Sequence, residues 1–332
     1  MVKPWLGDRW WRWLQAIAGL AIIAFVVRYL VRNWTAIRTE PVQWDINVGW
    51  LALYLLVVLA TFALLAESWR RMLAGWGARL AFVEAARVWV LSSMGKYLPG
   101  KVWSLAGMAM LAERRGISPV TATASALLLQ VVSLGTGALL VGATGVATLE
   151  SHRPGAKVAL VVIVLGSIAA LVVALSPPFA RRLRNALGRM RRTGAPRGAG
   201  EGEQGGMNDA EPAQRVTPSI GAVGFGVAAN LVAWGAYGFA LWCLAQGLLP
   251  AANLAFRDAI GGFAGSYIAG LLFLLAPGGL GVREGVLLWM LQDRIGPANA
   301  LALAGVSRIG MTVADLLAAL PFVLWLRRRN GE

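Results

Sequence analysis

The chain has 332 residues, of which 58% are hydrophobic and 14% are charged, and its mean hydropathy is +0.63. A soluble domain is about 45–50% apolar, so this composition excludes an ordinary soluble protein and indicates one integral membrane domain over residues 1–332. One cysteine and one histidine exclude an internal disulfide, a two-histidine metal site and paired histidine catalysts. The net charge of +15 comes mostly from arginines between apolar runs, which favours anionic lipid headgroups over nucleic acid.

The apolar runs predict membrane-spanning helices in chain order. A basic, tryptophan-rich N-terminus precedes the first run, which we expect to be retained as a span. Runs long enough for a span are expected at about residues 14–27, 48–66, 120–149, 158–175, 220–249 and 298–326. Two further apolar segments are broken by proline and glycine, at about residues 81–112 and 256–293.

Residues 176–217 differ from the rest of the chain. They contain eight arginines and a Gly/Glu-rich centre, which is typical of a flexible linker. The arginine excess predicts that this linker lies in the cytoplasm. The N-terminus and the Arg327–Arg329 run are also basic, so both termini are predicted to be cytoplasmic.

Two parts of the chain resemble each other. Residues 78–85 align with residues 252–259 at an offset of 174, which places Glu84 opposite Asp258. Pro99-Gly100 aligns with Pro277-Gly278, and in both copies another proline follows 20 residues after the first. We therefore expect two repeats, at about 48–149 and 220–326, although chance similarity between Ala- and Leu-rich helices is an alternative.

The predicted topology inverts the two repeats. With both termini and the linker inside, residues 81–112 begin and end inside, whereas residues 256–293 begin and end outside. The second arms, 102–112 and 286–291, are short for a full crossing, so re-entrant hairpins are favoured over pairs of crossings. The predicted fold is an all-α, polytopic membrane helix bundle with two inverted repeats, each containing a Pro/Gly-broken, re-entrant helical hairpin. Such repeats indicate a transporter with a site near the midplane.

Charged and backbone-breaking residues at the two breaks and in the last span form the candidate site. Charges inside a span face a cavity or a partner, and lysines beside a helix N-terminus suit a phosphate. The candidate substrate-binding residues are Lys96, Pro99, Gly100, Lys101, Pro277, Gly278, Gly279, Arg283, Glu284, Arg308 and Asp315. Lysines that reach to the interface and ion pairs that only close the hairpins are the alternatives. We expect Arg283, Glu284, Arg308 and Asp315 to come together and to neutralise one another, with the lysines as positive excess. No catalytic residue, metal site or cofactor is predicted.

Several runs resemble the lysylphosphatidylglycerol synthase transmembrane family. They are Gly95–Trp103, Arg115–Ser118, Ala276–Gly285, and Ser307-Arg308 with Asp315. In the family's best-known members this membrane region is joined to a cytosolic aminoacyl-transferase domain, and the membrane part is regarded as a flippase for aminoacylated phosphatidylglycerol. This sequence has no such soluble domain, so the resemblance implies the flippase-like half. Gln130 stands near a position where the family often has an acid, which weighs against a cationic aminoacyl headgroup.

The sequence therefore predicts a lipid translocase of the bacterial inner membrane, not an enzyme. It would move an anionic or modified phospholipid, or a polyprenyl-linked lipid, through a polar cavity between the repeats. The expected partners are lipids with anionic headgroups and a separately encoded lipid synthase or glycosyltransferase. An intramembrane lipid-modifying transferase, and a non-catalytic membrane partner of a glycosyltransferase, are the alternatives.

Overall fold

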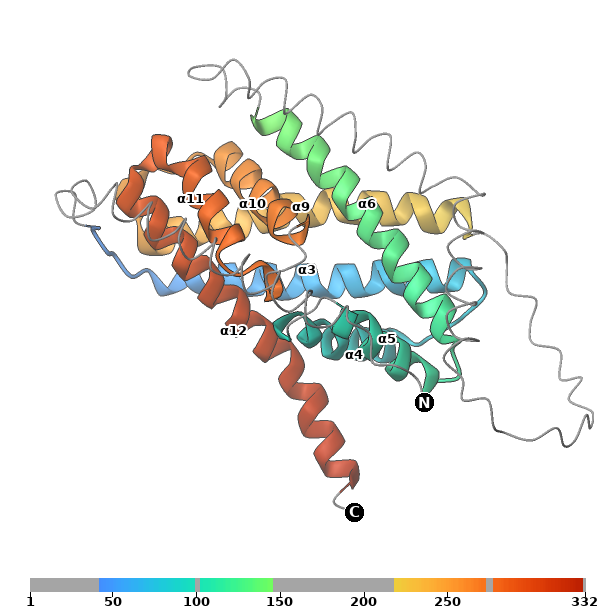
Figure 1. The fold of residues 1–332 in the computed structure, drawn as a ribbon. Coiled ribbons are helices and arrows are strands. Elements are labelled where there is room, and N and C mark those ends of the chain that lie inside the picture. The colour runs from blue at the N-terminus through green and yellow to red at the C-terminus, as the bar shows by residue number, and fades with distance from the viewer. Residues whose placement is uncertain (1–41, 99–101, 146–217, 273–276, 331–332) are drawn as a thin grey trace, which may run out of the picture.

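All regular structure in the described residues is helical. The computed structural model describes residues 42–98, 102–145, 218–272 and 277–330 (Figure 1). Four of its helices are long and apolar enough to cross a membrane. They are α3 (Val48–Gly75), α6 (Pro119–Gly145), α9 (Ile220–Leu248) and α12 (Pro297–Asn330). The prediction of a polytopic helical membrane protein is thus confirmed. The expected spans at 14–27 and 158–175, the linker 176–217 and both chain ends lie outside the described residues.

Helices α3 and α9 lie side by side and run antiparallel through the length of the bundle (Figure 1). At one end the Asp45 amide donates to the Leu248 carbonyl at 3.1 Å. At the other end a Cβ built on Gly75 would lie 3.2 Å from the Ser219 amide nitrogen, so the two backbones are close there as well. Each helix begins at a capping side chain, because Asn47 and Ser219 accept hydrogen bonds from amides in the first turns.

Helix α3 extends beyond the predicted end of its span near residue 66. The charges that suggested an end pair within the helix instead. Glu67 accepts from Arg70 Nε at 2.6 Å and from Arg71 Nε at 2.7 Å, spacings of three and four residues that place the side chains on one helical face. Because the charges compensate one another locally, the helix continues through them.

Helices α3 and α9 are each followed by a broken hairpin. The first is α4 (Phe82–Ser93), the 3₁₀ turn η1 (Met94–Tyr97) and α5 (Val102–Glu113). The second is α10 (Phe256–Leu272), the 3₁₀ turn η3 (Pro277–Gly279) and α11 (Val282–Ile295), and it is preceded by the short turn η2 (Pro250–Ala252). The second arm is longer than the predicted 286–291, because helix formation resumes directly after Gly281.

The arms of both hairpins are shorter than a bilayer crossing. At 1.5 Å per residue, α4 and α5 are each about 18 Å long, α11 about 21 Å and α10 about 26 Å, against a hydrocarbon core of about 30 Å. Helices α6 and α12 follow the hairpins after turns at Gly116 and Gly296, whose φ angles of +74° and +79° favour glycine. Both halves of the described chain therefore share one order: long helix, short helix, 3₁₀ turn, short helix, long helix.

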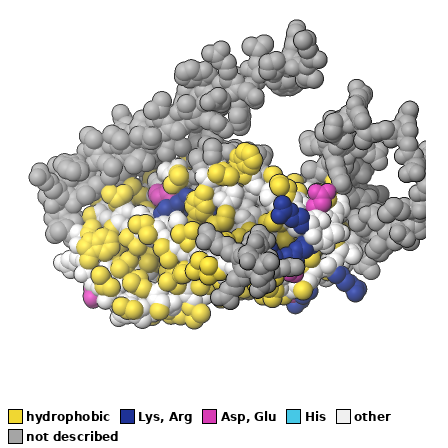
Figure 2. Space-filling model, turned by 90° about the horizontal axis from the view of Figure 1, so that it is seen from below, with side chains coloured by type: hydrophobic (Ala, Val, Ile, Leu, Met, Phe, Trp, Pro, Cys, Tyr) yellow, Lys and Arg dark blue, Asp and Glu magenta, His cyan; other side chains and the backbone are white. Residues whose placement is uncertain are grey.

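Buried side chains form two apolar clusters, one around each hairpin. The first hairpin packs with the C-terminal half of α3 and the start of α6, around Trp69 and Met72. The second packs with α9, α12 and the N-terminal half of α3, around Leu241, Leu287 and Leu303. Outside these clusters the surface stays apolar: Leu56 on α3 and Leu316 on α12 are exposed, as lipid-facing side chains would be. Figure 2 shows apolar side chains over much of one face, with the Lys and Arg side chains gathered in a few places.

Candidate functional site

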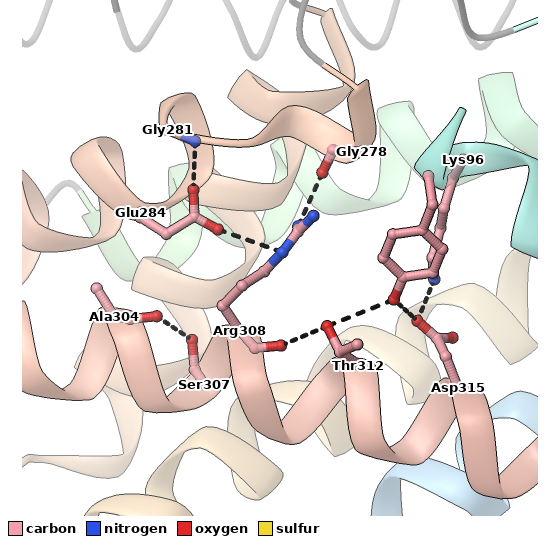
Figure 3. A network of polar contacts seen from close by, with 10 residues as sticks. Lys96, Gly278, Gly281, Glu284, Ala304, Ser307, Arg308, Thr312 and Asp315 are labelled. Atoms are coloured by element: carbon pink, nitrogen blue, oxygen red, sulfur yellow. Dashed lines mark hydrogen bonds and ion pairs between the residues drawn. The ribbon is translucent and has the colours of Figure 1, made fainter. Parts of the chain in front are cut away.

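The tips of the two hairpins meet each other beside α12. Turns η1 and η3 are in contact, although 180 residues separate Tyr97 from Pro277. A Cβ built on Gly278 would lie 3.3 Å from the Lys96 carbonyl oxygen, so the two backbones nearly touch. The φ angle of +56° at Gly278 also favours glycine, and this conformation turns the carbonyl of the tip toward α12 (Figure 3).

The first tip is joined to α12 through a buried carboxylate. Asp315 is 3% exposed, and its Oδ2 lies 2.6 Å from Lys96 Nζ and accepts from the Tyr97 hydroxyl at 2.6 Å (Figure 3). Thr312 lies one turn before Asp315 and anchors its own hydroxyl on the Arg308 carbonyl at 2.9 Å. Two adjacent residues of η1 thus share one acceptor atom on α12.

The second tip is joined to α12 through a cation. Arg308 Nη1 donates to the Gly278 carbonyl at 2.9 Å, and its Nε lies 3.7 Å from Glu284 Oε1 (Figure 3). The other oxygen of Glu284 accepts from the Gly281 amide at 2.6 Å, which caps the N-terminus of α11. Glu284 is therefore held by a backbone donor as well as by Arg308.

Arg283 occupies a different environment from its neighbour Glu284. It is 6% exposed and faces α10, where its guanidinium carbon lies 4.7 Å from the ring centre of Phe263 and 5.5 Å from that of Tyr267. Its Nη2 is buried and has no hydrogen-bond partner among the described residues. Cation–π contacts offset part of the cost of burying this charge but supply no counter-ion.

The predicted group of four charges is thus only partly assembled. Glu284 pairs with Arg308 as expected, but Asp315 pairs with Lys96, and Arg283 turns to the aromatic rings of α10. Lys96 is consequently not the positive excess we expected, because it neutralises Asp315. The five described charges sum to one positive charge, three cations against two carboxylates, and the unpaired cation is Arg283.

The remaining predicted site residues are Pro99, Gly100, Lys101, Pro277 and Gly279. The first three of these lie outside the described residues. Pro277 and Gly279 belong to η3, where Gly279 packs against Gly270: a Cβ built on Gly279 would lie 3.0 Å from the Gly270 Cα. Both residues are therefore part of the backbone that forms the tip.

Several polar contacts of the two hairpins were not predicted from the sequence. Tyr97 was predicted only as part of the Gly95–Trp103 run, yet it shares Asp315 with Lys96. At the open ends of the hairpins, away from the tips, Glu84 is ion-paired with Arg115, and Asp258 Oδ2 lies 3.9 Å from Arg294 Nε. The alignment of Glu84 with Asp258 in the sequence could have indicated these two pairs, because both acids stand in the first turn of the first arm of a hairpin.

The arrangement suits the binding of an anion better than covalent chemistry. Lys96 and Arg308 keep 37% and 18% of their side chains exposed, so an anion can approach them, and each already holds an oxygen acceptor. No group of three or more possible metal-binding side chains occurs in the part of the chain that the structure describes.

One protein-family model matches nearly the whole chain. A family model described as "Lysylphosphatidylglycerol synthase TM region" matches residues 16–319. No curated protein matches the chain.

Proposed function

Because the chain belongs to the lysylphosphatidylglycerol synthase TM region family, we propose that it is a lipid translocase. The cargo is an anionic or modified phospholipid, or a polyprenyl-linked lipid, moved across the bacterial inner membrane. Its headgroup passes through the polar site between the hairpin tips and α12 while its chains stay in the bilayer. No covalent step is required, so we propose transport and not enzymatic activity.

One observation carries this proposal: ionised side chains are gathered where two broken helices meet inside an apolar bundle. Lys96, Asp315, Glu284 and Arg308 lie on three different elements and meet at the hairpin tips. Charges at this position are costly unless they face one another or a polar cavity, and charged groups within membrane segments mark substrate paths. Backbone broken by glycine is tolerated in a bilayer only where protein or a watery cavity satisfies its polar groups.

We further propose that the two hairpins are re-entrant and belong to inverted repeats. The short arms, the shared element order, the antiparallel course of α3 and α9, and the meeting of η1 with η3 support this. The matching ion pairs at the open ends, Glu84–Arg115 and Asp258–Arg294, add to it.

The inversion depends on the expected topology. Both termini and the 176–217 linker are cytoplasmic, from the arginine bias of these segments. A reporter fused after Ala195 that is active only outside the cytoplasm would refute this topology and the inversion with it.

Reconstitution tests the transport directly. Vesicles that hold the purified chain are loaded with phosphatidylglycerol carrying a nitrobenzoxadiazole label on an acyl chain, and dithionite then destroys the label in the outer leaflet. Translocation exposes the inner-leaflet label as well, whereas a transferase or a non-catalytic partner protein leaves it protected. Arg308→Gln should abolish this exposure, and Arg79→Gln, the same change at an exposed arginine outside the site, should preserve it. Protection of the inner leaflet by the wild-type chain would refute the proposal.

A further inference from the structure

Asp315 depends on one cation for its charge balance. Its side chain is 4% exposed and Lys96 is the cation paired with it, whereas the Lys96 side chain is 37% exposed. The pair is therefore open from the lysine side and closed from the carboxylate side. An anion that binds Lys96 approaches from the open side and competes with Asp315 for the ammonium group.

An anionic headgroup competes with Asp315 for the same donors. Lys96 Nζ and the Tyr97 hydroxyl both lie 2.6 Å from Asp315 Oδ2. A phosphate oxygen accepts from ammonium and hydroxyl donors with the same geometry as a carboxylate oxygen. A headgroup that occupies these donors leaves Asp315 buried and charged without its counter-ion.

No other described group near the pair can take the place of Lys96. Arg308 is already engaged by Glu284 and the Gly278 carbonyl, and Arg283 faces the rings of α10. Tyr54, Tyr237 and Tyr267, on α3, α9 and α10, also lie within electrostatic reach of Asp315, and their hydroxyls are uncharged. A carboxylate in this position is relieved most simply by protonation, because burying an unpaired charge is far more costly than burying a carboxylic acid.

We propose that binding of an anionic phosphodiester headgroup to Lys96 and Tyr97 brings one proton onto Asp315, so that lipid and proton move together. This rests on the proposed lipid transport. A hydronium ion on the loading side gives its proton to the Asp315 carboxylate, which forms the O–H bond of the carboxyl group and leaves water. When the headgroup leaves toward the opposite side, the Lys96 ammonium returns to the carboxylate, and the proton passes to water there.

Glu284 does not share this role, although it is also paired with a cation. Its second oxygen accepts from the Gly281 amide at 2.6 Å, so the carboxylate keeps a donor when Arg308 turns to a phosphate. Its ion pair with Arg308 is also longer, at 3.7 Å. Glu284 can therefore remain charged throughout.

Calorimetry on the detergent-solubilised full chain tests the coupling. Dihexanoyl phosphatidylglycerol, whose phosphodiester does not titrate near neutral pH, is bound in buffers of different ionisation enthalpy. The dependence of the heat on the buffer then gives the number of protons taken up. The wild-type chain should take up about one proton per lipid, and its affinity should rise about tenfold for each unit by which the pH falls.

Two amide variants test whether the proton is taken up by Asp315 and not by another paired carboxylate. Asp315→Asn should bind without proton uptake, with an affinity independent of pH. Glu67→Gln neutralises a carboxylate that is paired with Arg70 and Arg71 outside the site, and it should behave as the wild type does. Binding by the wild type without proton uptake, or proton uptake that persists in Asp315→Asn, would overturn the proposal.

Labelled phosphatidylglycerol in vesicles with a pH gradient provides the second measurement. The label should accumulate in the leaflet opposite the acidic side with wild-type protein, and distribute evenly with Asp315→Asn. Lipid movement that ignores the gradient rejects proton coupling and leaves the proposed transport intact. Proton-linked binding without lipid movement rejects the proposed transport, and with it the joint movement of lipid and proton. The absence of both binding and movement rejects both.

Discussion

Replacing Arg283 by methionine should abolish lipid movement and leave the stability of the protein nearly unchanged. Arg283 is 6% exposed, its guanidinium lies 4.7 Å from the Phe263 ring centre, and Nη2 has no partner among the described residues. A desolvated cation–π contact contributes about 2 kcal/mol. An unpaired arginine at the centre of a membrane helix costs about 2.5–3.5 kcal/mol on insertion scales. The stabilisation lost with the cation–π contact and the desolvation cost removed with the charge are therefore of similar size.

Methionine fills the same space with a flexible apolar chain. The free energy of unfolding of Arg283→Met should stay within about 1 kcal/mol of the wild type, or rise, because a costly charge is removed. Lipid movement should nevertheless be lost, since the unpaired positive charge of the site is gone. Unfolding is followed by circular dichroism during titration of the detergent-solubilised protein with dodecyl sulfate, and movement by the dithionite assay on the same preparation.

Arg79→Met is the matched control, because Arg79 is exposed and lies outside the site. It should change neither the unfolding free energy nor the lipid movement. If Arg283→Met lowers the unfolding free energy by more than about 2 kcal/mol, the charge is structural and is compensated in the folded protein. If the variant is stable and moves lipid at the wild-type rate, Arg283 takes no part in transport.

Three further substitutions test the packing and the pairing around the tips. A Cβ built on Gly238 would lie 2.6 Å from the Cα of Ile260, so Gly238→Ala should push α9 away from α10 and lower the unfolding free energy by about 1–3 kcal/mol. Gly235→Ala is the control, because a Cβ there would meet nothing within 4 Å, and it should be neutral or stabilising by up to about 1 kcal/mol. Lys96→Met should destabilise the folded protein by about 3 kcal/mol because it leaves Asp315 unpaired, and the double variant with Asp315→Asn should recover most of that loss. Additive effects of the two changes on the unfolding free energy would contradict the pairing. Gly279→Ala should lower the melting temperature, because a side chain at a φ angle of +71° costs about 1–2 kcal/mol even before its contact with α10. An unchanged melting temperature would mean that the tip adopts another conformation.

Much of the helical architecture could be predicted because it depends on local properties. The runs at 120–149, 220–249 and 298–326 became α6, α9 and α12 with boundaries within a few residues, since length and apolarity suffice for a span. The break at Pro277–Gly281 was equally local, because Gly278, Gly279 and Gly281 have positive φ angles, which a helix does not accommodate. The end of α3 was misplaced because Glu67 pairs within its own helix, where charge does not interrupt it.

The sequence by itself determined the helices, the two breaks, the family and the set of charged residues. Only the tertiary structure decided which charges meet. Helical periodicity places Arg308 and Asp315 on one side of α12, but it does not say that one faces η3 and the other η1. That choice depends on how two hairpins pack against α12, and Tyr97 and Asp315 are 218 residues apart in sequence. The physical reason is that apolar burial fixes which elements pack together, while the cost of an unpaired charge fixes its partner only after the backbone has brought the candidates within reach.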